Sequence, residues 1–452
     1  MNTYLVAVIG SGSAGRAATL LAAGSGLRVA MIEKDRIGGT AFHRGCYAVA
    51  GLLGCARQFC DSRKSDRFGN EADVLQATLE NWRVAQWSAS TRLSENFEAE
   101  LKRLNVDTYQ GDAEVVEDQI LQITRASGSR MTIRADNIIV ATGSRPDFAD
   151  TSNPRLVNSD VLLGMTSCPG RLVIIGGGHI GCEFASIYRT LGSEVTLIER
   201  ENRLMPSWEP EAAERVTQTL QTRGVEIRLG CEISSDQIVA DRTGAHISVP
   251  GQRSVDTDLV LFATGRRPNS ARLGLQDLGI DDSSFLSVDQ YMRLPRAGLY
   301  AVGDVNGISL LDSTAFTQAN VAVRHIMGQS TGFDDRWATR CIHTDPCIAA
   351  VGQTEAEDKA EGVEYLTASD AIFLVSDNPR SIIDPEPTFL KVIVDAKSRC
   401  LLGCLATGDH APTIANSAAI AMRSGIKIDH LCQFGLTQPS ATDALMSTLR
   451  KL

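Results

Sequence analysis

The chain contains the same order of apolar and polar segments twice. A run of mostly β-branched residues ends in glycines at residues 5–15 (LVAVIGSGSAG) and again at 171–181 (RLVIIGGGHIG). Each run precedes a segment of small and apolar residues that is typical of a helix, and then a second apolar run that carries an acid, Glu33 or Glu199. This order predicts a strand, a tight turn, a helix and a parallel strand in both copies.

The glycines of each copy have the spacing of a dinucleotide-binding loop. They are Gly10, Gly12 and Gly15 in the first copy and Gly176, Gly178 and Gly181 in the second. The acid lies 18 residues after the third glycine in both copies. Such glycines let the backbone approach a pyrophosphate at a helix N-terminus, while the acid accepts hydrogen bonds from ribose hydroxyls. One loop of this kind is a weak signal, but two matched copies indicate two nucleotide sites.

The remaining pattern completes the predicted fold. The segments VATGSRP (140–146) and FATGRRPN (262–269) each follow an apolar run, and their glycine turn and proline are typical of crossings between domains. LYAVGD (299–304) reads as a strand whose terminal carboxylate could bind a polyol. Residues 71–104 predict one or two exposed helices, and from about residue 335 strand-like and helix-like segments mix. We expect an α/β fold with two Rossmann-like dinucleotide-binding domains and an α+β C-terminal domain.

Composition narrows the class of protein further. A length of 452 residues predicts two or three domains. The formal charge of −10 disfavours nucleic acid and anionic membranes as partners, and no apolar run reaches the ~18 residues that span a bilayer. The N-terminus reads as a first strand rather than a signal peptide. Eleven cysteines without a CxxC pair or zinc-type spacing predict reduced thiols, a cytoplasmic location and no metal site.

These segments together carry a resemblance to a known family. GSGSAG with Glu33, GGTAFHRGC at 38–46, GGGHIGCEFAS with Glu199, ATGRRPN, YAVGDV and TDPCIAAVGQTEAE follow one another as in the flavoprotein disulfide reductases. The chain thus resembles the class I pyridine nucleotide-disulfide oxidoreductases, which include lipoamide dehydrogenase, glutathione reductase, mercuric reductase and soluble transhydrogenase. The resemblance runs nearly end to end, and it implies FAD, a pyridine nucleotide and a homodimer.

The resemblance also implies where the cofactors bind. Residues 1–145 and 265–334 would form the FAD-binding domain, 146–264 the NAD-binding domain and 335–452 the dimerisation domain. The ADP half of FAD would lie at the first glycine loop, its ribityl chain at Asp304, and the pyridine nucleotide at the second loop. Further cofactor-binding residues that the resemblance implies are Ser13, Ala14, Lys34, Gly39, Thr40, Gly45, Ala113, Ala141, Thr142, Gly143, His179, Ile180, Arg200, Gly265, Gly303 and Ala315.

The second loop also predicts which pyridine nucleotide is preferred. A carboxylate at Glu199 accepts a hydrogen bond from a free 2′-hydroxyl and repels a 2′-phosphate, so NAD(H) is favoured over NADP(H). Arg200 follows directly and would act in the opposite direction. By resemblance His179 would cover the nicotinamide pocket, and the alternative is a turn histidine that faces solvent.

The sequence departs from the family at the residues of its thiol chemistry. Where the family has C-x-x-x-x-C followed by a lysine, this chain has Ala41, Cys46 and then Ala50. The family's C-terminal histidine and glutamate are replaced by Gln438 and Asp443. Glutamine cannot act as a general base near neutral pH, whereas histidine can. The candidate catalytic residues are Cys46, Glu183, Gln438 and Asp443.

The absence of the lysine affects Glu183. In the family, the lysine at the position of Ala50 pairs with the glutamate at the position of Glu183. Without that partner, burial is expected to raise the pKa of Glu183, so that a neutral carboxyl could donate a proton at the flavin edge. The alternative is that Arg44 or solvent replaces the lysine and Glu183 stays ionised.

Three functions remain open at this point. The first is an NADH-dependent flavoenzyme that passes electrons through FAD to a non-disulfide small molecule, such as a quinone, a dye-like oxidant or a pyridine nucleotide. The family supports it, because soluble transhydrogenases lack one redox cysteine and the histidine, and some mycobacterial relatives without the first cysteine reduce quinones. The second is a dihydrolipoamide dehydrogenase-like thiol or disulfide reductase that uses Cys46 alone or with a displaced cysteine, with a lipoyl protein as partner. The third is a non-enzymatic flavin-binding protein.

Overall fold

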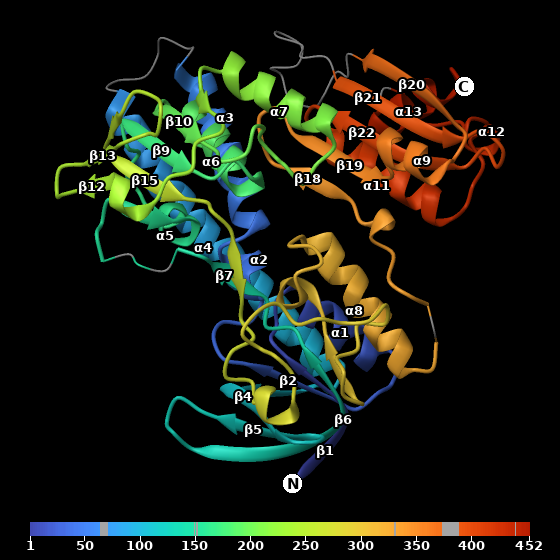
Figure 1. The fold of residues 1–452 in the computed structure, drawn as a ribbon. Helices are drawn as coiled ribbons and strands as arrows, with labels where there is room; N and C mark the ends of the chain where they lie inside the picture. The colour runs from blue at the N-terminus through green and yellow to red at the C-terminus, as the bar shows by residue number, and fades with distance from the viewer. Residues whose placement is uncertain (64–70, 149, 151, 330, 373–387, 439) are drawn as a thin grey trace.

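The computed structural model describes residues 1–63, 71–148, 150, 152–329, 331–372, 388–438 and 440–452. Two parts are built around parallel strands and a third around an antiparallel sheet (Figure 1). This arrangement confirms the expected α/β fold with an α+β C-terminal domain, whereas the exact domain boundaries stay predictions. None of the helices in these ranges has the length and apolar character needed to cross a membrane.

The first part is a sheet in the order β3-β2-β1-β6-β5-β4, with β17 beside β6. Small residues on both helices, such as Ala18 and Ala319, let α1 pack closely on α8. The elements of this part are β1 (Asn2–Ile9), α1 (Ser13–Gly24), β2 (Val29–Glu33), α2 (Gly39–His43), α3 (Cys46–Arg63), α4 (Glu71–Arg103), β3 (Asp107–Gln110), β4 (Asp112–Glu117), β5 (Ile120–Thr124), β6 (Arg130–Val140), β7 (Ser144–Pro146), β17 (Leu299–Ala301) and α8 (Asp312–Ile326).

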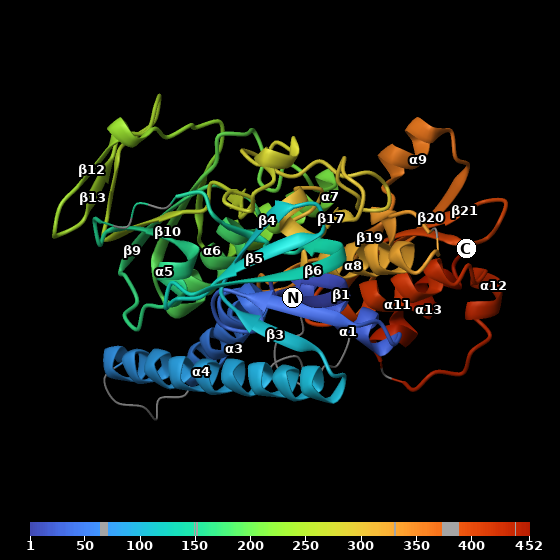
Figure 2. The same cartoon turned by 90° about the horizontal axis from the view of Figure 1, so that it is seen from below.

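The segment expected to hold one or two helices forms a single long helix, α4. Figure 2 shows α4 along the outside of the molecule. One end buries Leu79 and Trp82 in the same cluster as Leu52 of α3, and the other end buries Phe97 and Leu101 beneath the first sheet. Because α4 contributes side chains to both apolar clusters, it connects α3, which begins at Cys46, to the core of the first part.

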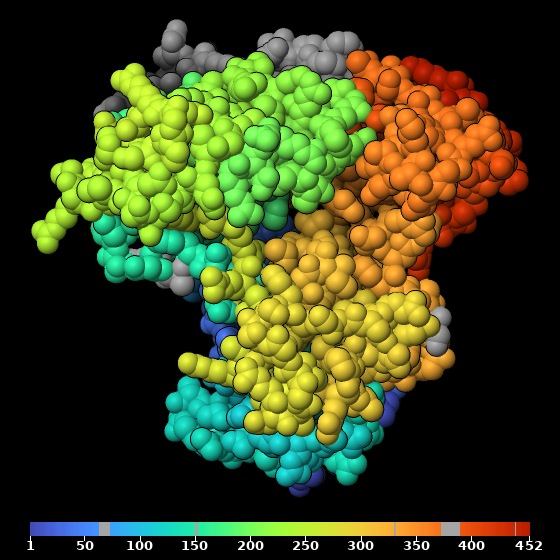
Figure 3. Space-filling model, viewed as in Figure 1, coloured from blue at the N-terminus to red at the C-terminus, as the bar shows by residue number. Residues whose placement is uncertain are grey.

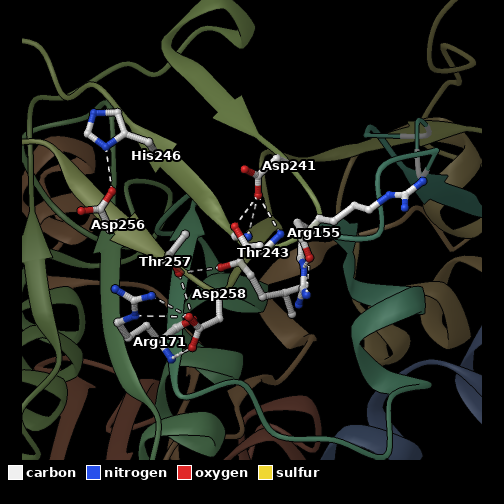
Figure 4. A network of polar contacts seen from close by, with 11 residues as sticks. Arg155, Arg171, Asp241, Thr243, His246, Asp256, Thr257 and Asp258 are labelled. Carbon is white, nitrogen blue, oxygen red and sulfur yellow. Dashed lines mark hydrogen bonds and ion pairs between the residues drawn. The ribbon is translucent and has the colours of Figure 1, made fainter.

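The second part is a parallel sheet in the order β11-β10-β9-β15-β8, with a small antiparallel sheet beside it that the sequence did not predict. Thr257 of the small sheet donates a hydrogen bond to the carbonyl of Arg171 on β9 at 2.9 Å, and the next residue, Asp258, pairs with the Arg171 side chain at 2.7 Å (Figure 4). The elements are β8 (Leu156–Asn158), α5 (Ser159–Leu163), β9 (Arg171–Ile175), α6 (His179–Leu191), β10 (Glu194–Ile198), α7 (Pro210–Thr222), β11 (Glu226–Arg228), β12 (Ile238–Ala240), β13 (Ala245–Ile247), β14 (Val255–Thr257), β15 (Leu259–Phe262) and β16 (Arg266–Pro268).

The third part is an antiparallel sheet in the order β18-β19-β22-β21-β20. Helices α11 and α13 bury small and branched side chains on it, such as Ala415, Ala418 and Leu445. The strand-like and helix-like segments that the sequence predicted after about residue 335 correspond to β19, β21, β22, α11 and α13, whereas β18 and β20 were not predicted. The elements are β18 (Arg340–Ile342), β19 (Ile348–Gly352), α9 (Glu355–Glu361), β20 (Tyr365–Ile372), β21 (Thr388–Asp395), β22 (Leu401–Thr407), α11 (Ala411–Arg423), α12 (Ile428–Leu431) and α13 (Ala441–Leu449).

Candidate active site

The first glycine loop is shaped for close approach of a ligand. Gly10 has φ +102°, and a Cβ there would lie 2.5 Å from the carbonyl oxygen of Ala141, while a Cβ at Gly15 would lie 1.9 Å from the oxygen of Gly10. These two glycines therefore fix the turn and its packing. A Cβ at Gly12 would meet no atom within 4 Å, whereas one at Gly39 would lie 2.7 Å from the Cα of Gly12. The second glycine thus borders open space at the N-terminus of α1, where a pyrophosphate would fit.

The second loop repeats this geometry at the start of α6. Gly176 has φ +108°, and its Cβ would lie 2.4 Å from the oxygen of Ala263. A Cβ at Gly181 would lie 1.9 Å from the oxygen of Gly176, and one at Gly178 would again meet nothing within 4 Å. The two loops are therefore built alike, and both fit the anionic half of a dinucleotide.

The acid of the first copy is held at the end of β2. Glu33 accepts hydrogen bonds from the amide and hydroxyl of Ser11 at 2.8 and 2.6 Å, and from the amide of Asp35 at 2.8 Å. Its carboxylate therefore stands beside the glycine turn. Lys34 is exposed, and its carbonyl accepts a hydrogen bond from Gln110.

The acid of the second copy is placed in the same way at the end of β10. Glu199 accepts from the amides of Gly177 at 2.5 Å and Glu201 at 2.8 Å, and only 6% of it is exposed. The side chain of Arg200 is 68% exposed and lies 3.3 Å from the carboxylate of Glu201. The arginine is therefore occupied outside the loop rather than at Glu199.

Asp304 lies where the first sheet meets the crossing strands. Its carboxylate accepts from the hydroxyl of Ser144 at 2.5 Å and is 3.9 Å from Arg266, while burial raises its pKa. The hydroxyl of Thr142, on the same crossing segment, is buried and makes no hydrogen bond to the protein. A buried acid and an unpaired hydroxyl next to the first glycine loop fit a ligand rich in hydroxyl groups, as the ribityl chain of FAD is.

The other FAD residues that the sequence assigned lie around this loop in most cases. Ala14 and Ala315 flank Gly303, whose Cβ would come within 2.9 Å of Ala14. A Cβ at Gly45 would lie 3.0 Å from the carbonyl oxygen of Thr40. Ser13, at the start of α1, hydrogen-bonds to Asp312 at the start of α8. Gly143 and Gly265 border open space on the two crossing segments, whereas Ala113 is buried in the core of the first part.

The remaining thiol of the predicted redox loop is not activated. Cys46 begins α3, and burial raises the pKa of its thiol to about 11, with further effects from the negative charges of Asp312 and Glu183. No disulfide joins any of the eleven cysteines, all of which lie in described ranges. The nucleophile and the resolving group of disulfide chemistry must be thiolates, so this environment opposes such chemistry.

Glu183 has the raised pKa that the missing lysine predicted. It lies on α6 with 8% of its surface exposed, and burial raises its pKa to about 7, while a hydrogen bond from the amide of His343 at 2.9 Å acts in the opposite direction. Arg44 does not replace the lysine, because it instead lies near Asp35 at 3.7 Å and Asp160 at 3.8 Å. Near neutral pH the carboxyl is therefore divided between its neutral and charged forms.

His179 and Ile180 open α6 beside this acid, and both are partly buried. Burial lowers the pKa of His179 to about 4, and Arg266 adds to the effect. The histidine is therefore a neutral ring at pH 7 rather than a charged, solvent-facing one. Its place at the helix start keeps it a candidate for covering a nicotinamide.

The C-terminal pair lies on α13 and the segment before it. Gln438 donates a hydrogen bond to Asp443 at 3.0 Å, and the hydroxyl of Ser440 accepts from the amide of Asp443 at the helix start. The pair is thus ordered as a unit within the third part. Its role at the flavin of a partner subunit stays a prediction.

The residues that sequence reasoning missed are those that join the parts. Ser144 and Arg266 lie on the paired strands β7 and β16, where Arg266 donates to the hydroxyl and carbonyl of Ser144 at 2.7 and 2.9 Å. The similarity between the segments at 140–146 and 262–269 could have indicated these two residues. His343 gave no signal in the sequence, because it acts through its backbone amide.

Figure 3 shows a hollow where the three parts meet, with N-terminal atoms coloured blue at its floor.

Among the described residues, no group of three or more histidine, cysteine or acidic side chains is arranged to hold a metal ion.

Comparison with known proteins assigns the class that this geometry indicates. A family model described as pyridine nucleotide-disulphide oxidoreductase matches residues 4–325, and the dimerisation domain of the same family matches residues 338–449. The chain belongs to this family, the class I pyridine nucleotide-disulfide oxidoreductases, and is an FAD-dependent NAD(P)H oxidoreductase with a dimerisation domain.

Among individual relatives, dihydrolipoyl dehydrogenase of Staphylococcus aureus is 29% identical over 98% of this chain and 95% of its own, and that of Bacillus subtilis is 28% identical over 97% and 94%. The fold is shared with solved structures of LpdA from Mycobacterium tuberculosis (TM-score 0.88, 24% identity, 100% of this chain and 99% of that one). It is also shared with the HOCl-induced flavoprotein disulfide reductase RclA from Escherichia coli (TM-score 0.82, 24% identity, 99% of both chains).

Proposed function

We propose that the protein transfers electrons from NADH through FAD to a non-disulfide acceptor such as a quinone. The observation that carries this proposal is the contrast between two parts of the site. Both glycine loops and their acids have a geometry that suits nucleotide binding. At the thiol site, by contrast, Ala41 stands where the family has its first redox cysteine, and the remaining Cys46 is a buried thiol with a pKa of about 11.

The chain's own residues have separate tasks in this reaction. FAD, when bound, supplies hydride chemistry between the nicotinamide and the acceptor. The two loops bind and orient the nucleotides, and Asp304 with Ser144 would hold the ribityl chain. Glu183, with a pKa of about 7, would give a proton to the reduced acceptor or take one up.

The experiment that tests this proposal is anaerobic mixing of the FAD-loaded protein with NADH. Bleaching of the flavin absorbance, followed by its return when a quinone is added, supports the proposal. A flavin that NADH does not bleach would refute the proposal.

A thiol-dependent disulfide reductase is the second candidate, and one observation favours it. The charge of Cys46 contributes to the raised pKa of Cys341 on β18, so the two thiols lie within electrostatic range of each other. Cys341 could then serve as the displaced second cysteine. Relatives named dihydrolipoyl dehydrogenase also make a lipoyl protein a possible substrate-bearing partner. Against this candidate stands the burial that raises the pKa of both thiols.

NADH is expected to exceed NADPH as reductant by at least tenfold in kcat/KM, or roughly 1.4 kcal/mol. The reason is that two backbone amides hold the Glu199 carboxylate beside the second glycine loop, where it would meet the 2′-hydroxyl, while Arg200 is turned to Glu201. Steady-state kinetics with both nucleotides checks this. Glu199→Ala should lower the ratio of kcat/KM for NADH to kcat/KM for NADPH. In the matched variant Glu201→Gln, release of Arg200 should raise the use of NADPH while Glu199 remains. Equal efficiency of the two nucleotides in the wild type would refute the preference.

A homodimer of about twice 48.6 kDa is expected in light scattering of the FAD-loaded protein. The dimerisation domain supports it, and large apolar side chains are exposed there, including Ile420 on α11 (68%) and Phe434 (56%). Ile420→Glu should shift the mass toward the monomer. Val239→Glu is the matched control, because Val239 is equally exposed (70%) but lies on β12. A monomer with FAD bound in the wild type would contradict the expectation.

A further inference from the structure

A short segment between β18 and β19 is attached to α6 by two backbone amides. The amide of His343 donates to Oε1 of Glu183, and the amide of Asp345 donates to Oγ of Ser186, both at 2.9 Å. Residues three apart share one face of a helix, and the amides of His343 and Asp345 both donate to side chains on that face. One face of α6 therefore accepts both amides, and the segment lies along it.

The carboxylate of Asp345 joins this segment to the two other domains. Its Oδ1 lies 2.6 Å from Nη2 of Arg57 on α3, and its Oδ2 lies 2.8 Å from Nη1 of Arg223 at the end of α7. Arg57 also contacts Asp409, in front of α11, at 2.8 Å. Asp345 is only 5% exposed. One buried carboxylate thus contacts guanidinium groups from the FAD-binding and NAD-binding parts at once.

Such a cluster is better explained by the geometry that it fixes than by stability. Removing charged groups from water costs free energy that buried ion pairs often only offset. We propose that Asp345 is a positioning residue for Glu183: its ion pairs and its amide hold the segment so that the His343 amide stays on the Glu183 carboxylate. The consequence for turnover rests on the proposed role of Glu183, but the positioning itself can be measured without turnover.

The His343 amide is the polar contact on Glu183 that the segment controls. It stabilises the charged carboxylate and so lowers the pKa of Glu183 below the value that burial alone would give. The imidazole of His343 is itself neutral at pH 7, because burial and Arg57 lower its pKa. Among the described residues, the other titratable groups whose charges interact with Glu183 are thiols with raised pKa values: Cys46 from α3, Cys182 from α6, Cys341 from β18 and Cys347 before β19.

Infrared difference spectroscopy of the FAD-loaded protein as a function of pH tests the proposal. The C=O stretch of the protonated Glu183 carboxyl is assigned by its loss in Glu183→Gln, and its midpoint gives the pKa directly. Asp345→Asn keeps the size of the side chain but removes its charge, so it should loosen the segment and raise the midpoint by about half a pH unit or more. Ser186→Ala removes only the acceptor of the Asp345 amide and should raise it by a smaller amount.

Asp409→Asn is the matched control, because it removes a partner of Arg57 without touching the segment or α6. Its midpoint should equal that of the wild type. The proposal is overturned if neither Asp345→Asn nor Ser186→Ala moves the midpoint, or if Asp409→Asn moves it equally. Should Asp345→Asn not fold with FAD, the shift in Ser186→Ala decides. Normal quinone turnover in Glu183→Gln, together with the expected infrared shifts, would reject the catalytic role of Glu183 and leave the positioning intact.

Discussion

Lipoamide and glutathione disulfide are expected to reoxidise the NADH-reduced flavin at no more than about a thousandth of the rate of a quinone-type acceptor. At pH 7 a thiol with a pKa of about 11 is ionised in only about one molecule in ten thousand. The position of the second thiol holds Ala41, and Gln438 cannot serve as a base. Stopped-flow absorbance with each acceptor in turn measures the ratio.

Cysteine variants show whether any disulfide activity belongs to the flavin site. Cys46→Ser is expected to keep at least a third of the wild-type rate of quinone reduction. Cys55→Ser, the matched control at a cysteine later in the same helix α3, is expected to do the same. Efficient lipoamide reduction that disappears in Cys46→Ser would reject the quinone proposal. If it disappeared in Cys341→Ser as well, the displaced-cysteine mechanism would be the correct one.

Glu183→Gln is expected to lower the rate of quinone reduction by about a hundredfold or more, because an amide cannot transfer the proton. In the wild type the neutral, proton-donating carboxyl is present below its pKa of about 7 and is lost above it. The rate should therefore fall as the pH rises through about 7, and this limb should be absent in Glu183→Gln. Pre-steady-state rates of flavin reoxidation between about pH 5 and 9 provide the measurement.

Thermal unfolding separates this loss from damage to the fold. The folded pKa of Glu183 is raised above its unfolded value, so the wild type loses stability as the pH rises from about 4.5 to 7, by up to about 3 kcal/mol. Glu183→Gln carries no such penalty and should melt no lower than the wild type at pH 8. A variant with full activity, or with the wild-type pH limb, would show that another group supplies the proton.

The nucleotide sites could be predicted from the sequence because their chemistry is local. Gly15 packs against Gly10 of its own strand–turn–helix unit, and Glu33 accepts hydrogen bonds from the amides of Ser11 and Asp35 in the same unit. Such units repeat with fixed spacing, so two copies were enough to indicate two nucleotide sites, whereas the identity of FAD as one of the cofactors came from the family resemblance. The absence of a cysteine at position 41, where the chain has Ala41, is also visible in the sequence alone, and it already indicated that disulfide chemistry is disfavoured.

The protonation of the site was decided only by the tertiary structure. Whether Glu183 finds a cation depends on where Arg44 folds, and the chain turns Arg44 toward Asp35 and Asp160. The partner that Glu183 has instead is a backbone amide 160 positions away, which no side-chain pattern records. Arg57, Arg223 and Asp345 meet for the same reason: ion pairs between domains depend on how the domains pack, whereas sequence motifs describe one turn and its neighbours.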